Sequence, residues 1–266
     1  MTDAPQADAL TLARQALSAR PAALFVDFDG TLSPIVLDPT GARLVPGAAE
    51  ALRALAGQFA VVCIVTGRAA SDVRRMTGLV EVWIAGNHGI EWLAPGESQV
   101  ERPPALAGNR AELERLLALV PPIAGVWVED KGLSAAVHYR GTPDPAAARA
   151  QVLAALSAAV SGTAIELREG RMSVELRPMG LGDKGSAVRA LAERFALRGL
   201  LVLGDDVTDL DMFRAAAELR EGGAAATVIA VGGHGEVPAR VAEAADVVVA
   251  DPKAAVVLLA ALAAGA

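Results

Sequence analysis

Short apolar runs alternate with segments of helical spacing along most of this chain, and this alternation restricts the fold more than any other feature. The runs are AALFV (22–26), FAVVCIV (59–65), EVWIA (81–85), LLVLG (200–204), ATVIAV (226–231) and ADVVVA (245–250). Strands buried on both faces of a parallel sheet have this composition. Segments with helix-like spacing separate them, at residues 46–57, 69–78, 184–196, 208–219 and 236–245. The alternation predicts an α/β fold with a doubly wound, Rossmann-like parallel sheet.

The middle of the chain departs from this pattern. Two helix-like segments are each followed by a pair of strand-like runs, in the order 109–120, 125–132, 133–140, 144–160, 163–170 and 171–178. Tight glycine-containing connections join the strands of each pair, as hairpins require. We therefore expect an inserted α+β domain with an antiparallel sheet. The expected bounds are 1–105 for the first part of the parallel-sheet core, 106–182 for the insert and 183–266 for the second part of the core.

Composition narrows the class of partner. A formal net charge of -7 and a pI near 5.1 argue against nucleic acid, whose partners usually present a basic face. The single cysteine, Cys63, excludes an internal disulfide and lies in an apolar run, where a buried thiol is expected. No secretory signal is visible at the start, and the apolar segment 253–266 is shorter than the roughly 20 residues that span a bilayer. We expect a cytoplasmic monomer without a membrane partner.

Polar residues follow several of the apolar runs, at the point where each run ends. Asp27 and Asp29 follow the first run, Thr66 follows the second, and Asp205 follows the run at 200–204; Lys184 opens a helix just upstream of the latter run. In an open parallel sheet, ligands bind beyond the carboxyl ends of the strands. We therefore expect carboxylates, a hydroxyl and an ammonium group to converge at one edge of the sheet.

This set of groups suits phosphoryl transfer through a covalent intermediate. The Asp27 carboxylate can attack phosphorus, and Asp29 can protonate the leaving oxygen and then deprotonate a water. Thr66 and Lys184 can hold the oxygens of the transferred group. Clustered carboxylates of Asp27, Asp29 and Asp205 would repel one another without a cation, and hard oxygen ligands favour Mg²⁺ over zinc.

Simpler roles remain open for the same residues. Asp29-Gly30 between hydrophobic runs is a strong hairpin signal, and the 206–209 segment is typical of a helix cap. Lys184 alone would be a surface lysine, and Thr66 alone a helix cap. The joint pattern favours a reaction centre, in which Gly30, having no side chain, lets the backbone turn tightly and come close to a phosphate.

These motifs resemble those of the haloacid dehalogenase superfamily of phosphatases. Asp-Phe-Asp-Gly-Thr-Leu (27–32), Thr66, Lys184 and Gly-Asp-Asp-Val-Thr-Asp (204–209) match its motifs in order. More narrowly, the chain resembles the trehalose-6-phosphate phosphatase family along nearly its whole length. The narrower resemblance is carried by TGR (66–68), NHGIEW (87–92), VEDKGLSAAVHYR (128–140), REGRMSVELRP (168–178), DKGSAV (183–188) and LGDDVTDLDMF (203–213). Thr66 is a departure, because the family more often has serine there, but the hydroxyl is kept.

The resemblance implies roles for the run-end residues. Asp27 is expected to be the nucleophile and Asp29 the general acid and base. Asp27, the Asp29 carbonyl and Asp205 are expected to hold Mg²⁺. The same resemblance implies that the inserted domain is a cap that closes over the substrate.

In that cap, the resemblance implies that Glu129, Lys131 and Glu175 bind the sugars. Glu129 and Lys131 alternate on one strand and so face the same way, and Glu175 lies on another strand. Without the resemblance, a solvated sheet face with cross-strand ion pairs would explain them. Further candidates for substrate binding are Gly30, Arg68, Asn87 and His88. The tryptophans are expected to pack in the core or between domains rather than to serve as sugar platforms; they are Trp83, Trp92 and Trp127.

The expected function is Mg²⁺-dependent hydrolysis of trehalose 6-phosphate to trehalose and phosphate through an aspartyl phosphate, a step of trehalose biosynthesis. The expected partner is this small phosphorylated disaccharide. One alternative is a broader sugar-phosphate phosphatase or a phosphosugar mutase of the same superfamily. Another is a phospho-accepting signalling domain, which also uses an acidic cluster, a hydroxyl and a lysine around a phosphorylated aspartate.

Overall fold

The computed structural model describes residues 4–36, 38–103, 108–170, 172–180, 182–233 and 237–265, which form two compact units. The first unit, called the core unit below, combines Met1–Glu101 with Gly182–Ala266. The second, called the inserted unit, is Arg102–Leu181. The expected boundary between residues 105 and 106 lies outside the described residues.

A seven-stranded sheet forms the centre of the core unit. Neighbouring strands are parallel except β3 and β4, which are antiparallel. The order across the sheet is β11 (Val247–Val249), β10 (Ala225–Val231), β9 (Gly199–Gly204), β1 (Ala22–Val26), β2 (Val61–Val65), β3 (Trp83–Gly86) and β4 (Glu91–Leu93). Because β1 lies between β9 and β2, the residues that follow these strands meet at one edge of the sheet.

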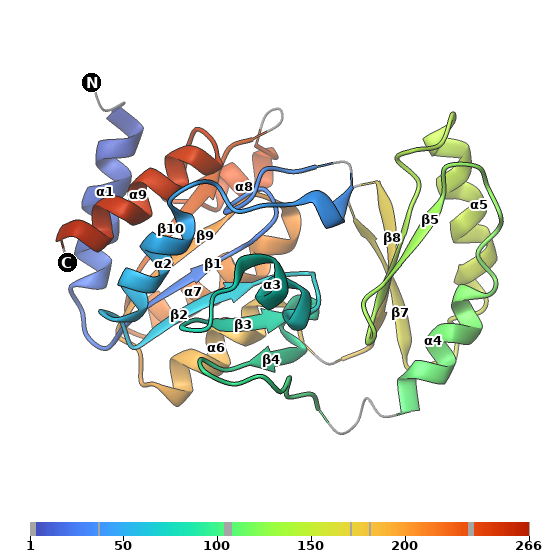
Figure 1. Ribbon diagram of the computed structural model, residues 1–266, viewed down its shortest axis with the longest axis horizontal. Coiled ribbons are helices and arrows are strands. Elements are labelled where there is room, and N and C mark those ends of the chain that lie inside the picture. Colours follow the sequence, from blue (N-terminus) through green and yellow to red (C-terminus); the bar gives the residue numbers. More distant parts are fainter. Residues whose placement is uncertain are drawn as a thin grey trace. The chain divides into compact units, whose positions relative to one another are not determined.

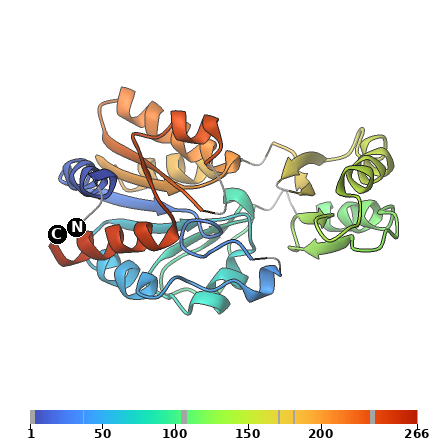
Figure 2. The same ribbon diagram turned by 90° about the horizontal axis from the view of Figure 1, so that it is seen from above.

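Successive strand residues enter two different hydrophobic clusters. In β1, Leu24 and Val26 belong to one cluster and Phe25 to the other, as the alternation of side chains along a strand requires. The first cluster contains residues of α1 (Ala4–Leu17), α2 (Ala48–Ala56), α3 (Ala70–Thr77) and α9 (Pro252–Gly265). The second contains residues of α6 (Lys184–Arg194), α7 (Leu210–Glu221) and α8 (Ala239–Glu243). Helices therefore cover both faces of the core sheet (Figures 1 and 2), which confirms the predicted doubly wound α/β fold.

Short 3-10 turns connect several elements of the core unit. They are η1 (Pro39–Gly41), η2 (Asn87–Gly89) and η4 (Val207–Asp209). The expected buried thiol of Cys63 lies fully inside the sheet, and its burial raises the pKa of the thiol. None of the helices within the described ranges combines the length and the apolarity that crossing a membrane needs. The apolar C-terminal segment instead forms most of α9, which buries Leu258, Leu259 and Leu262.

The inserted unit has a four-stranded antiparallel sheet. Its order is β5 (Trp127–Asp130), β6 (Ala135–His138), β8 (Ser173–Pro178) and β7 (Ile165–Gly170). The helices are α4 (Asn109–Leu117) and α5 (Pro145–Ser157), and α5 begins after Asp144, whose side chain accepts the amide hydrogen of Ala147 at 3.0 Å. Residues from one sheet face and from both helices form a separate core. The other face, called the polar face below, carries Glu129, His138 and Glu175.

The tryptophans differ in their surroundings. The rings of Trp83 and Trp92 meet edge to face with centroids 6.4 Å apart within the core unit. Trp127 is 41% exposed on the edge strand β5, so it does not pack in the core, and its packing between the units stays a prediction. An edge strand has a neighbour on one side alone, which leaves a large side chain near its end partly open to solvent.

Candidate active site

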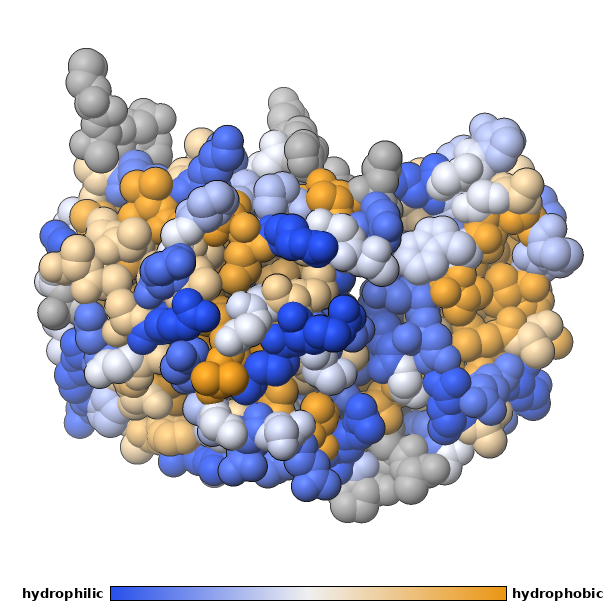
Figure 3. All heavy atoms as spheres, in the orientation of Figure 1, coloured by the Kyte–Doolittle hydropathy of each residue, from blue (hydrophilic) through white to orange (hydrophobic). Residues whose placement is uncertain are grey.

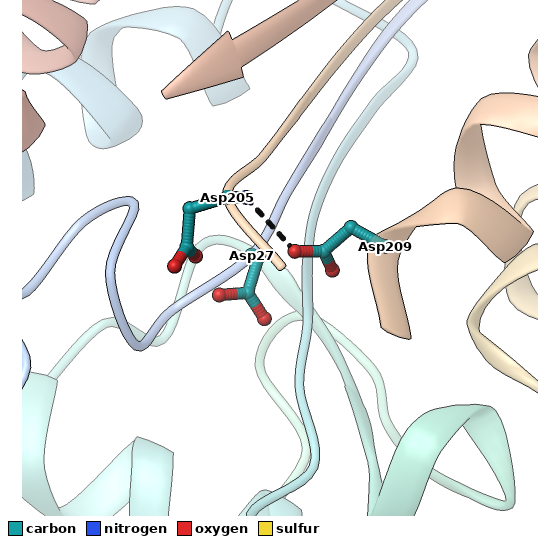
Figure 4. A group of neighbouring side chains, drawn as sticks. All are labelled: Asp27, Asp205 and Asp209. Carbon is teal, nitrogen blue, oxygen red and sulfur yellow. Dashed lines mark hydrogen bonds between the residues drawn. The ribbon is translucent and has the colours of Figure 1, made fainter. Parts of the chain in front are cut away.

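Three buried carboxylates gather at the carboxyl edge of the core sheet. Asp27 directly follows β1, and its amide hydrogen bonds to the carbonyl of Leu203 at 3.0 Å; Asp205 directly follows β9. One side-chain oxygen from each of Asp27, Asp205 and Asp209 lies within 4.8 Å of the others. Figure 4 shows these carboxylates turned toward one another, together with the bond from Asp209 to the backbone of Asp205. The predicted convergence of carboxylates is confirmed for Asp27 and Asp205, whereas Asp209 takes the place expected for Asp29 in this group.

Burial and mutual repulsion make Asp27 and Asp205 hard to ionise. Burial raises the pKa of Asp205 to about 9, and the charges of Asp27 and Asp209 add to the effect. Burial also raises the pKa of Asp27 well above its ordinary value, the charge of Asp209 adds to this, and Lys184 offsets part of it. A bound cation would reverse this penalty, because it favours the ionised form of each oxygen ligand. The set of oxygen donors fits Mg²⁺.

Lys184 is buried at the start of α6 and joins two of these carboxylates. Its Nζ donates to Asp27 Oδ1 at 2.5 Å and to Asp209 Oδ1 at 2.6 Å. Burial alone would lower the pKa of Lys184, but the charges of Asp209 and Asp27 and their hydrogen bonds raise it. The lysine is therefore a cation held inside the site, and the alternative of a solvated surface lysine is wrong.

Asp209 contacts both the loop after β9 and the buried lysine. Its Oδ2 accepts the amide hydrogens of Asp205 at 2.9 Å and Asp206 at 3.1 Å, and the second bond is one half of a capping box on η4. The Asp209 side chain makes no cap hydrogen bond to α7, so the expected capping of that helix is not observed. Its Oδ1 at the same time accepts from Lys184. Asp209 therefore fixes the loop that carries Asp205 and orients the ammonium group. Asp209 was not predicted as a site residue, although its spacing from Asp205 placed it near the site.

Asp29 lies apart from the buried carboxylates and pairs with Arg68. Arg68 Nε donates to Asp29 Oδ2 at 2.6 Å, and a terminal nitrogen of the same guanidinium donates to Oδ1 at 2.7 Å. Arg68 also donates to the carbonyl of Pro39 at 2.8 Å and lies over the Phe28 ring, 5.4 Å from its centroid. The residue expected to act as acid and base is thus clamped at both oxygens, a pairing that nothing in the sequence indicated.

Gly30 permits a close approach between two motifs. Its φ is +92°, and a Cβ built at this position would lie 2.1 Å from Asp205 Oδ2. The next residue, Thr31, donates its hydroxyl to Asp205 Oδ1 at 3.1 Å. The backbone after Asp27 therefore approaches the Asp205 carboxylate, where any side chain at Gly30 would collide with it.

The loop after β2 is tied to the loop after β3. Thr66 is buried, and its Oγ accepts the amide hydrogen of Arg68 at 3.1 Å. The amides of Asn87 and His88 donate to the carbonyls of Arg68 and Thr66, each at 2.8 Å. A Cβ on Gly67 would lie 2.7 Å from His88 Nε2, so the imidazole packs directly on this glycine. Asn87 and His88 thus hold the Thr66 loop through their backbone amides. Their φ values of 49° and 60° lie in the left-handed region, which few residues other than glycine adopt.

A buried carboxylate caps α3, the helix that follows this loop. Glu91 Oε1, from β4, accepts the amide hydrogen of Ala70 at 2.6 Å. A Cβ on Gly86 would lie 2.4 Å from the same nitrogen, so strand and helix pack closely here. Glu91 was not predicted from the sequence, where it stands as one charged residue between Ile90 and Trp92.

The sugar-binding candidates of the inserted unit lie together on the polar face of its sheet. Lys131 Nζ is 3.7 Å from Glu175 Oε1 and 4.0 Å from Glu129 Oε2. Glu129 Oε2 also lies 2.9 Å from His138 Nε2. The carboxylates and the ammonium group therefore form one connected charged cluster.

Comparison with known proteins agrees with this geometry. The Trehalose-phosphatase family profile matches residues 25–246. The trehalose-phosphate phosphatase of Mycobacterium tuberculosis is 40% identical over 228 residues, which cover 80% of this chain and 56% of that protein. A second protein of that bacterium, described as an uncharacterized glycosyl hydrolase, is 40% identical over 212 residues, 76% of this chain and 16% of that protein. The chain thus spans about half of the first relative and a smaller part of the second.

Solved structures show the same fold. The C-terminal domain of the C. albicans trehalose-6-phosphate phosphatase superposes with a TM-score of 0.79 at 21% identity, covering 97% of this chain and 96% of that one. The resemblance inferred from the motifs is confirmed by the profile and the relatives. The chain therefore belongs to the trehalose-phosphatase family.

Proposed function

We propose that this chain is a phosphatase that hydrolyses trehalose 6-phosphate to trehalose and phosphate, a step of trehalose biosynthesis. The observation that carries the proposal is the buried group of Asp27, Asp205, Asp209 and Lys184 at the carboxyl edge of the core sheet. Membership of the trehalose-phosphatase family supports the choice of substrate.

Asp27 is the nucleophile in the proposed mechanism. One of its oxygens forms a bond to phosphorus while the bond from phosphorus to the sugar oxygen breaks, which gives an aspartyl phosphate and an alkoxide. Asp29 gives a proton to the alkoxide and later takes one from the water that attacks the aspartyl phosphate. Both Asp29 oxygens now accept from Arg68, so acid catalysis requires Asp29 to give up part of that pairing.

The remaining groups stabilise charge and position the transferred group. Lys184 donates to Asp27, and in the proposed mechanism its ammonium group stabilises the negative charge that grows on the phosphoryl oxygens. The Thr66 hydroxyl and the backbone amides after Asp27 supply further donors. Gly30 allows these amides to approach, as a larger residue would not.

A divalent cation fits the carboxylates of the site. We propose that Asp27, Asp205 and the main-chain carbonyl of Asp29 hold Mg²⁺, whereas Asp209 is engaged by Lys184 and by backbone amides. When bound, the cation would neutralise charge on the phosphoryl oxygens and lower the repulsion among the ligands.

We assign substrate binding to residues of both units. Gly30, Arg68, Asn87 and His88 belong to the core unit, and Glu129, Lys131 and Glu175 to the inserted unit. Carboxylates and an ammonium group suit a disaccharide, because together they accept and donate hydrogen bonds to many hydroxyls. The net charge of -7 disfavours nucleic acid as a partner, and we propose a monomeric, cytoplasmic enzyme. Light scattering on the purified chain tests the monomer.

The test of the function is a phosphate-release panel with and without Mg²⁺. The substrates are trehalose 6-phosphate, glucose 6-phosphate and p-nitrophenyl phosphate, with product sugars monitored for isomerised phosphosugars. We expect Mg²⁺-dependent release, fastest per unit concentration from trehalose 6-phosphate. Preference for another sugar phosphate would overturn the substrate but keep the reaction class, and an isomerised product would indicate a mutase.

Asp27→Asn tests the covalent step. We expect turnover to fall by at least about 10³-fold, because an amide is a poor nucleophile toward phosphorus. Asp206→Asn is the matched control, because Asp206 follows Asp205 at the same edge of the core sheet but caps η4 instead of joining the buried carboxylates. A near-normal rate for Asp27→Asn would contradict the mechanism. A stable, stoichiometric phosphoprotein in the wild type would instead indicate a signalling domain.

A further inference from the structure

The polar face of the inserted unit's sheet carries an aromatic ring beside its charged cluster. Trp127 and Glu129 are two residues apart on β5, so both side chains project from the same face. Trp127 pairs in register with His138 on β6, and the two rings are stacked with centroids 4.2 Å apart and planes 13° apart. The same imidazole contacts Glu129 at 2.9 Å. The Trp127 ring therefore contacts the His138 imidazole, which in turn contacts the Glu129 carboxylate.

The charged cluster continues from Glu129 across the sheet. Lys131 joins Glu129 to Glu175, which lies on β8 and pairs in register with Ala136 of the intervening strand β6. The opposite face of the sheet supplies Val137, Val174 and Leu176 to the core of the unit. The aromatic and charged residues thus lie outside that core, and its packing does not account for their presence.

Trp127 leaves much of its large apolar ring open to water. The stack on His138 covers one side of the indole, while 41% of the residue remains exposed. The exposed large hydrophobic residues described in the inserted unit are Leu119, Trp127, Val128 and Met179, and apolar surface is visible on this unit in Figure 3. Trp127 differs from Val128, its neighbour, because it shares a face with hydrogen-bonding groups.

We propose that Trp127 is a specificity-determining residue that stacks on a glucose ring of the substrate. A pyranose ring has apolar C–H faces and a rim of hydroxyls, so it binds best where a flat apolar surface adjoins hydrogen-bonding groups. The indole supplies such a surface, and Glu129, Lys131 and Glu175 supply the groups. The inference rests on the proposed function and deepens it, because it names the contact that selects a disaccharide over a phosphate ester without a sugar.

The first experiment separates sugar recognition from chemistry. Trp127→Leu removes the aromatic face but keeps an apolar side chain, and Trp127→Phe keeps an aromatic face. For trehalose 6-phosphate we expect Trp127→Leu to raise KM about tenfold with kcat nearly unchanged, and Trp127→Phe to recover most of the loss. Activity toward p-nitrophenyl phosphate should stay at the wild-type level in both variants, because this substrate has no sugar.

Val128→Thr is the matched control. Val128 is 38% exposed on the same strand but pairs in register with Val137, on the face that the core uses. We expect its kinetic constants with both substrates to equal those of the wild type. A Trp127→Leu variant whose KM for trehalose 6-phosphate stays within about twofold of the wild type would overturn the inference, as would equal losses with p-nitrophenyl phosphate.

A second experiment measures binding without turnover. Titration of the wild type with trehalose should change the tryptophan fluorescence in a saturable way, and Trp127→Phe, which retains Trp83 and Trp92, should lose this change. No saturable change in the wild type would overturn the inference. A wild-type chain that shows the Trp127-dependent change but releases no phosphate from trehalose 6-phosphate would refute the proposed function and support the role of Trp127.

Discussion

Lys184 balances the negative charge of two carboxylates, Asp27 and Asp209, that are almost fully shielded from water. Its side chain and those of Asp27 and Asp209 are almost fully buried, and each carboxylate accepts one of its N–H bonds. In such a group, removal of the cation leaves two buried acids that must either stay ionised without a partner or take up protons. Lys184, which we assign to the proposed reaction, is therefore also needed for the stability of the fold.

Replacing Lys184 with Met should destabilise the protein by about 3–5 kcal/mol, because breaking a buried ion pair costs about that much. Urea unfolding at neutral pH measures the loss. Lys253→Met is the control, because Lys253 is exposed on α9 and its loss should change stability by less than about 0.5 kcal/mol. If Lys184→Met lowered the free energy of unfolding as little as the control does, Lys184 would not be needed to balance the buried carboxylates.

At the scale of elements, strand β4 holds the start of α3, the helix that follows the Thr66 loop. Alanine precedes α3 at the cap position and offers no side-chain acceptor, so Glu91 from β4 bonds to the first helical amide instead. The carboxylate is fully buried, and the helix N-terminus that it faces favours negative charge. β4 thereby fixes where α3 begins, and with it the position of the loop that ends at Arg68.

Glu91→Ala should lower the free energy of unfolding by about 1–3 kcal/mol, because the buried amide of Ala70 would lose its acceptor. Glu91→Gln keeps an oxygen at the same place and should lose less than half as much. Chemical denaturation of both variants provides the measurement. Equal losses would show that charge or packing, rather than this hydrogen bond, accounts for the role of Glu91.

The elements were largely predictable from the sequence, but some contacts were not. Continuous apolar runs identified β1 at its observed bounds, because a strand buried on both faces allows no polar position. β4 was missed, since three residues with a buried glutamate among them show neither an apolar run nor alternation. The exposure of Trp127 was missed for a related reason, because position at a sheet edge depends on strand order.

The sequence predicted the site residues that directly follow a parallel strand. Asp27 and Asp205 follow from the rule that ligands bind at the carboxyl ends of parallel strands. The clamp of Arg68 on Asp29 and the double role of Asp209 depend on the path of loops, which the sequence pattern does not specify. Such contacts join residues far apart in the chain and require the structure.

For the whole molecule, the buried carboxylates should make stability depend on pH and, through the proposed Mg²⁺, on a cation. The pKa of Asp205 is near 9 in the folded chain, whereas the ordinary value is 3.8. Between these values the folded chain keeps a proton that the unfolded chain has released, so stability falls as pH rises. Below that window both states are protonated, and the penalty is absent. A cation that binds the ionised carboxylates opposes the loss.

Without Mg²⁺, the free energy of unfolding should therefore fall between pH 5 and pH 8 with a slope of about 1 kcal/mol per pH unit. Asp205→Asn should flatten this slope, because the amide does not titrate. Added Mg²⁺ should restore stability at pH 8 in the wild type and much less in the variant. Urea unfolding with chelator or with Mg²⁺ checks both effects, and parallel pH profiles for the two proteins would contradict the assignment.

The insertion has a consequence for synthesis on the ribosome. Strand β1 is central in the core sheet, yet its partner β9 begins at Gly199, after the whole inserted unit has been translated. At a translation rate of about 5–20 residues per second, roughly 10–35 s pass between the synthesis of β1 and that of β9. The inserted unit is contiguous and can complete its own sheet during this interval. Until β9 is synthesised, β1 lacks one of its two neighbours, so this interval is when the apolar strands of the nascent core sheet most need protection from aggregation.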